Sequence, residues 1–139
     1  DGEPVRADAG PVGRYLYEPD GAAIRAGLVA EVAEMVGGRL LDPQIAYVTS
    51  DRHVVTPWAS CYEISEMMPF SGKRLRAALR ARKVGEVVIK KRGSAVDVER
   101  LRRDLRLSGE NRAVVILTRI SDKPYAMICT AMRNPAVHG

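Results

Sequence analysis

The chain has 139 residues and a mass of 15.2 kDa, which is enough for one domain or two very small ones. It is 46% hydrophobic and 28% charged with a net charge of +5, a globular composition that excludes wholesale disorder, collagen and coiled coil. Apolar runs are short, as from Ala113 to Leu117, so we expect no membrane association. The two cysteines, Cys61 and Cys129, fit neither a disulfide framework nor a metal pattern. With no basic-then-apolar leader, these features favour the reducing cytoplasm.

The first half of the chain predicts one strand, one helix and two further strands. Residues 1–12 are rich in Gly, Pro and Asp and are typical of a linker or a frayed terminus. A short strand over 15–17 precedes a helix that Asp20 caps and that Gly37 and Gly38 end. Strands are then expected over 45–49 and 58–68.

The second half predicts a helix, a strand, a second helix and a hairpin. Ser71 caps a helix that runs to about Lys83, and a strand follows over 86–91. Asp97 caps a short helix that Gly109 ends. The hairpin joins strands over 112–120 and 125–132 through a turn at 121–124.

This order of elements, β-α-β-β followed by α-β-α-β-β, predicts an α+β fold of two small sheet-and-helix modules. We expect the first module over 13–69 and the second over 70–133, with a tail at 134–139. Because the chain begins at Asp1 and not at Met, we also expect it to be a piece of a longer protein.

Positive charge is concentrated in the second module. Between Lys73 and Arg106 lie thirteen Lys or Arg and four acids, a net of +9, whereas the remainder carries nine basic and thirteen acidic residues, a net of −4. Seventeen of the 22 basic residues are Arg, whose planar guanidinium suits phosphate. A concentrated positive field attracts polyanions. A genome that favours Arg codons explains the excess of Arg over Lys but explains the clustering poorly.

The segment Ile89-Lys90-Lys91-Arg92-Gly93-Ser94 is the most informative motif. Three cations leave the end of a strand, Gly93 allows close approach of the backbone, and Ser94 with the next helix N-terminus offers donors to an anion. Strand alternation places at most part of the cationic trio on one face. The alternative is a basic edge strand in which lysine blocks aggregation and glycine makes a turn.

The sequence contains no motif of an independent enzyme. No glycine-rich dinucleotide or P-loop spacing is present, and neither His53 nor His138 has a metal-ligand partner at useful spacing. Cys61 and Glu63 are weak candidates for a small independent active site. Aromatic residues are only 5% of the chain, so a nucleic acid would be bound through its phosphates and shape and not by base stacking.

Two stretches resemble a known bacterial arrangement. Residues 13–20 (GRYLYEPD) with 24–28 (IRAGL) resemble the opening of a small ferredoxin-like module. Residues 69–94, ending in IKKRGS, and 101–109 (LRRDLRLSG) resemble the THUMP-like domain that follows it. In that family, of which actinobacterial members are especially similar, both modules form the C-terminal region of a class I S-adenosylmethionine-dependent methyltransferase.

The resemblance implies a catalytic domain upstream of this chain, with S-adenosylmethionine as its cofactor and none bound here. It also implies a non-catalytic module that recognises RNA, either tRNA or rRNA, for the methyltransferase domain in cis. The expected phosphate contacts are Lys90, Lys91, Arg92, Gly93, Ser94, Arg100, Arg102, Arg103 and Arg106, extended by Lys73, Arg74, Arg76 and Arg80. The alternative is a protein-docking module that packs on the catalytic domain without binding RNA.

Overall fold

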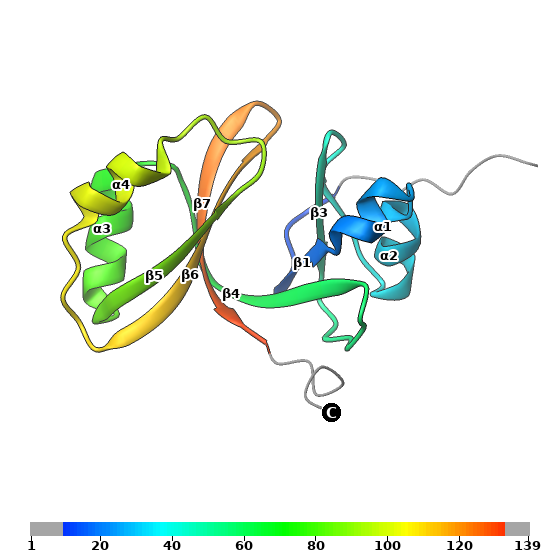
Figure 1. Cartoon of the computed structure of the whole chain (residues 1–139), viewed down its shortest axis with the longest axis horizontal. Coiled ribbons are helices and arrows are strands. Elements are labelled where there is room, and N and C mark those ends of the chain that lie inside the picture. The colour runs from blue at the N-terminus through cyan, green and yellow to red at the C-terminus, as the bar shows by residue number, and fades with distance from the viewer. Residues whose placement is uncertain (1–9, 133–139) are drawn as a thin grey trace, which may run out of the picture. The chain divides into compact units, whose positions relative to one another are not determined.

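The computed structural model describes residues 10–132, in which seven strands and four helices form an α+β fold, as predicted (Figure 1). The predicted linker up to residue 9 and the predicted tail lie outside the described residues. The described residues form two compact units: unit 1 holds 10–63 with 131–132, and unit 2 holds 64–130. In the part of the chain described, no helix is long and apolar enough to cross a membrane.

Unit 1 consists of β1 (Tyr15–Pro19), α1 (Gly21–Arg25), α2 (Val29–Met35), β2 (Arg39–Asp42), β3 (Ile45–Ser50) and the first part of β4 (Ala59–Pro69). Its strands form a four-stranded antiparallel sheet in the order β2-β3-β1-β4. Its core contains Tyr17, Val36, Val48 and Cys61, all buried.

Two features of unit 1 differ from the sequence prediction. The single helix expected after Asp20 is two helices, because Gly27 adopts a left-handed φ of 74° and breaks the chain between α1 and α2. The strand β2 was not predicted, since its four residues are too few to show a period. It forms a hairpin with β3 through the Asp42-Pro43 segment, where Asp42 Oδ1 accepts a hydrogen bond from Gln44 N at 2.9 Å.

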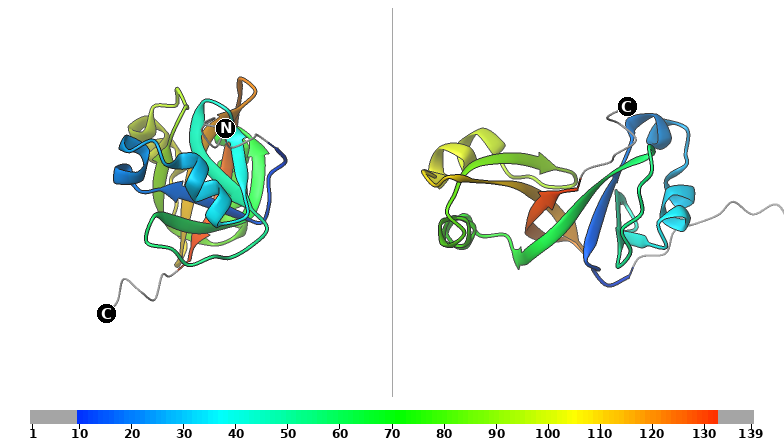
Figure 2. Two further views of the ribbon diagram at one scale, coloured as in Figure 1. Left: turned by 90° about the vertical axis from the view of Figure 1, so that its right-hand side faces the viewer. Right: turned by 90° about the horizontal axis from the view of Figure 1, so that it is seen from below.

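Unit 2 consists of the rest of β4, α3 (Gly72–Ala81), β5 (Val84–Lys91), α4 (Val98–Leu105), β6 (Asn111–Ile120) and β7 (Lys123–Ala131). Its strands form a four-stranded sheet in the order β4-β7-β6-β5, and both helices pack against one face. The strands β6 and β7 form an antiparallel hairpin, whereas β5 lies at the edge and runs parallel to β6. Figure 2 shows α3 nearly end-on in its right-hand view.

Both predicted helix caps of unit 2 are confirmed. Ser71 Oγ accepts a hydrogen bond from Arg74 N at 3.3 Å, and Asp97 Oδ1 accepts one from Arg100 N at 3.2 Å. The prediction that Gly109 ends α4 is wrong, because the helix already stops at Leu105 and Arg106 takes the left-handed conformation with φ of 47°.

The turn between β6 and β7 is tighter than the sequence predicted. Only Ser121 and Asp122 lie outside the strands, with φ of 52° and 67°, and the strand pairing begins at Ile120 and Lys123. Two consecutive positive φ values are the requirement of a type I′ turn, whose twist matches that of the strands.

Candidate nucleic-acid interface

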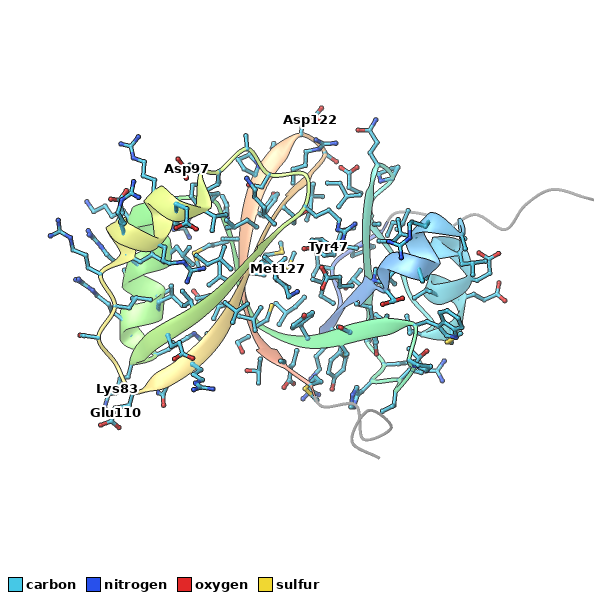
Figure 3. All side chains as sticks on the ribbon, viewed as in Figure 1. Tyr47, Lys83, Asp97, Glu110, Asp122 and Met127 are labelled. Atoms are coloured by element: carbon cyan, nitrogen blue, oxygen red, sulfur yellow. The ribbon has the colours of Figure 1, made fainter. Side chains whose placement is uncertain are left out.

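The cations of α3 and α4 face away from the unit 2 core because each helix buries a narrow apolar stripe. Leu75 and Leu79 of α3 and Leu101 and Leu105 of α4 are buried together against the sheet. Arg or Lys occupies seven of the other fourteen positions of the two helices, and all of these side chains except Arg76 are exposed. Figure 3 shows nitrogen-tipped side chains projecting from both helices.

Two arginines of α3 connect the helices to each other. Arg76 Nη1 donates to Asp104 O and Arg80 Nη2 donates to Arg106 O, each at 3.4 Å. These acceptors are carbonyls at the end of α4, which have no partner within the helix. Arg76 and Arg80 therefore fix the outer surface of α4 next to that of α3.

A hollow lies beside each of these two arginines. The first has a volume of about 450 Å³ and is lined by Gly72, Lys73, Arg76, Asp104 and Arg106. The second has a volume of about 520 Å³ and is lined by Arg80, Lys83, Val84 and residues 108–111. Lys83 and Glu110 mark the end of the sheet at which the second hollow lies (Figure 3).

Several cations on this surface have no partner among the described residues. Within residues 10–132, the side chains of Lys73, Arg74, Lys83, Arg103 and Arg106 make neither an ion pair nor a hydrogen bond. All five are exposed. They are thus available to an external anion without first breaking an internal contact, and we call them the open cations.

Other predicted contacts are engaged inside the protein. Arg102 Nη1 donates to Val87 O on β5 at 2.9 Å, and Lys91 Nζ donates to Val96 O at 3.0 Å. Arg100 Nε lies 3.8 Å from Asp104 Oδ2, with both side chains mostly exposed. The first two are structural contacts, whereas the last is a weak surface pair that an anion can displace.

The structure does not assemble the IKKRGS motif into one phosphate cradle. Val87 and Ile89 belong to the core under the helices, so alternation along β5 places Lys91 on that side and Lys90 on the opposite face. The backbone of Arg92 still pairs with β6, since its N–H donates to Leu117 O at 3.0 Å. The predicted trio is therefore divided between the two faces of the sheet.

Backbone donors beyond the strand are partly engaged within the protein. Ser94 Oγ accepts a hydrogen bond from Val96 N at 3.1 Å, and the Asp97 carboxylate caps α4. Gly93 has φ of 74°, so glycine is required there by the backbone conformation. The N-terminus of α4 thus already has a carboxylate on one of its N–H groups, and phosphate contact there stays a prediction.

Sequence reasoning missed Lys83 as a separate candidate, although it counted toward the basic cluster. Lys83 follows α3 with a left-handed φ of 57°, and its N–H donates to Arg80 O at 2.9 Å. The position of Lys83 directly after the basic helix α3 was the sequence signal that could have identified it.

The hypothesis of a small active site at Cys61 or Glu63 gains no support. A hollow of about 200 Å³ lies beside Cys61, but burial raises the pKa of its thiol, whereas a nucleophile needs a lowered one. Glu63 Oε2 is held by Arg14 at 2.6 Å. Among residues 10–132, no group of three or more His, Cys, Asp or Glu side chains is placed to hold a metal ion.

The chain belongs to the THUMP domain-like family, which matches residues 59–131. It is 42% identical over 136 residues to an uncharacterized S-adenosylmethionine-dependent methyltransferase of Mycobacterium tuberculosis, found in strains CDC 1551 and H37Rv. The match covers 98% of this chain and 37% of each relative, so the chain spans little more than a third of their length. The resemblance to a methyltransferase-associated THUMP-like region is thereby confirmed.

A solved structure shares the fold. The crystal structure of a Porphyromonas gingivalis W83 protein assigned as a methyltransferase superposes with a TM-score of 0.73 at 21% sequence identity. The match covers 92% of this chain and 32% of that protein. At this level of identity, the comparison establishes the fold and nothing more.

Proposed function

We propose that this chain is an RNA-recognition region of a longer S-adenosylmethionine-dependent methyltransferase, and that unit 2 contacts the RNA. The observation that carries the proposal is the surface of α3, α4 and the residues that directly follow them, which carries the five open cations, three of which line one of the two hollows. The family match and the names of the relatives support it. In this proposal the cofactor is held by another part of the longer protein, and this chain supplies substrate binding only.

The mode of binding is contact with phosphates. Phe70 and Tyr125, the aromatic residues of unit 2, are only half-exposed and flank the helical surface in sequence. A surface of this type reads the charge and shape of a folded RNA and carries little base-stacking capacity. The methyl transfer then depends on the RNA being held in a fixed position relative to the catalytic part.

Binding of the 139-residue chain to bulk tRNA and to a duplex DNA, followed by fluorescence anisotropy at several salt concentrations, tests the proposal. We expect tighter binding to tRNA, with a log–log salt slope that falls by about one unit for each of Arg74→Ala and Arg103→Ala. Two matched controls are Arg25→Ala on α1 and Arg112→Ala, whose side chain is paired with Glu86 at 2.9 Å.

Three outcomes separate the proposal from its rivals. If Arg103→Glu leaves the affinity for tRNA unchanged, the surface is wrongly placed. Equal binding to tRNA and duplex DNA means that the cations attract any polyanion and that recognition resides elsewhere. No binding at low salt contradicts the proposal and favours docking of this chain against the catalytic part of the longer protein.

A further inference from the structure

The hollow over Arg76 differs from the rest of the basic surface because its cations come from two helices and surround one space. Lys73 and Arg76 lie in the first half of α3, and Arg106 directly follows α4. The volume of about 450 Å³ is within the range of sites that hold a small ligand group. We call this space the α3–α4 hollow.

The charge lining the α3–α4 hollow is strongly unbalanced. Three cations line it, and Asp104 is the one acid among its lining residues. The Asp104 carboxylate already has Arg100 Nε at 3.8 Å, and the neighbouring carbonyl of Asp104 accepts from Arg76. The hollow therefore presents about two uncompensated positive charges, by a count of its lining groups.

One of the three cations has its side chain held by a backbone contact, and a second follows α4 at a defined backbone position. Arg76 is half-buried and bridges the two helices. Arg106 occupies a left-handed position at the end of α4, and its carbonyl is fixed by Arg80 Nη2 at 3.4 Å. The Arg106 side chain starts from this fixed backbone position, and its guanidinium has no partner among the described residues. Arg76 is therefore already positioned for an anion, whereas the exposed side chains of Lys73 and Arg106 become ordered when it binds.

We propose that the α3–α4 hollow binds a terminal phosphate monoester of the RNA. A monoester carries about −1.5 to −2 charges near pH 7 and has three acceptor oxygens, whereas an internal phosphodiester carries about one negative charge. The two uncompensated positive charges of the hollow match the charge of the monoester. The guanidinium groups of the hollow can each donate to several oxygens of one phosphate. This inference rests on the proposed RNA binding and adds to it the preference for one end of the molecule.

The test compares three RNA hairpin oligonucleotides of one sequence, with a 5′-phosphate, a 3′-phosphate or hydroxyls at both ends. The whole chain is titrated into each, and inorganic phosphate serves as competitor. We expect one of the two phosphorylated forms to bind at least about 10-fold more tightly than the hydroxyl form. The form that binds tightly identifies which end of the RNA enters the hollow.

Substitutions locate the effect. Lys73→Ala and Arg106→Gly remove the preference for the terminal phosphate, whereas Arg103→Ala, outside the hollow, weakens binding of all three oligonucleotides by the same factor. Glycine suits the left-handed φ at position 106, so that variant keeps the fold, which thermal unfolding checks.

The outcomes distinguish this inference from the proposed function. Equal affinities for the three oligonucleotides, with a steep salt dependence, overturn the terminal-phosphate site and leave RNA binding intact. Persistence of the preference in the Lys73→Ala/Arg106→Gly double variant also overturns it. Absence of binding to all three at low salt contradicts the proposed function and, with it, the inference.

Discussion

Gly85 and Gly109 lie backbone to backbone where β5 begins and the segment after α4 approaches β6. A β-carbon on Gly85 would collide with the carbonyl oxygen of Gly109, and one on Gly109 would collide with the carbonyl oxygen of Lys83. Gly109 N also donates to Val84 O at 3.3 Å. The register of β5 against β6 shifts between Val84 and Glu86 at this point. This close contact between the two glycine backbones thus fixes where the parallel pairing of β5 with β6 begins.

Replacing Gly85 with alanine should destabilise the protein by about 3 kcal/mol, because a rigid backbone group occupies the space of the new methyl. The measurement is urea unfolding followed by circular dichroism. Gly72→Ala is the matched control, since its β-carbon meets nothing closer than Leu101 Cδ1 at 3.9 Å and alanine favours the helix. Equal stability of the two variants would contradict the close crossing.

Replacing Lys83 with glycine should stabilise the protein by about 1 kcal/mol. Lysine at this position holds the left-handed conformation, with φ of 57°, which costs a side-chain-bearing residue about that amount. The melting temperature reports the gain. In the tRNA assay the same variant should lower the salt slope, because an open cation is lost from the second hollow. A lower melting temperature would show that the Lys83 side chain has a stabilising contact.

Arg102 and Arg103 are neighbours in sequence and should behave differently. Arg102→Ala removes the hydrogen bond to Val87 O and should cost about 1 kcal/mol of unfolding free energy, with a small effect on the salt slope. Arg103→Ala should leave stability unchanged and lower the salt slope by about one unit. Parallel urea unfolding and anisotropy titrations measure both. Identical behaviour of the pair would show that Arg102 also serves as a phosphate contact.

Alkaline pH should destabilise the folded chain. Burial raises the pKa of Cys129 from 9 to about 12 and that of Tyr17 from 10 to about 12. Because the unfolded chain loses these protons first, the stabilising contribution is complete below pH 9 and is lost as the pH rises to about 12. Urea unfolding at a series of pH values follows the loss.

Cys129→Val separates the two groups in that experiment. It retains an apolar side chain in β7 and removes the thiol, so the decline should become shallower, with Tyr17 and Cys61, whose pKa burial also raises, accounting for the part that remains. An unchanged decline would mean that other groups dominate it.

Local sequence signals predicted the framework of unit 2. Ser71 and Asp97 were identified as caps because their side chains bond to backbone only three residues away. The strand that ends in Lys91 was visible from its alternating apolar residues. The short strand β2 and the break at Gly27 were missed, since four residues show no period and a glycine inside a helical pattern is often tolerated.

The distribution of the cations could not be predicted in the same way. Arg102 bonds to a carbonyl 15 residues away, and Arg76 to one 28 residues away. Such contacts depend on how helices and strands pack, which no local pattern encodes. The basic cluster was evident from counting charges, but its division into engaged and open cations required the structure.

The parallel pairing of β5 with β6 has a consequence for the order in which unit 2 assembles. The β6–β7 hairpin closes through a two-residue turn, whereas the contact of Thr118 Oγ1 with Arg92 O joins residues 26 apart. Pairings between residues that are close in sequence form faster than those between distant residues. We therefore expect β5 to stay unpaired during synthesis until the β6–β7 hairpin has formed. During that time Lys90 and Lys91 disfavour pairing of β5 with a strand of another chain, because their charged side chains repel such an approach.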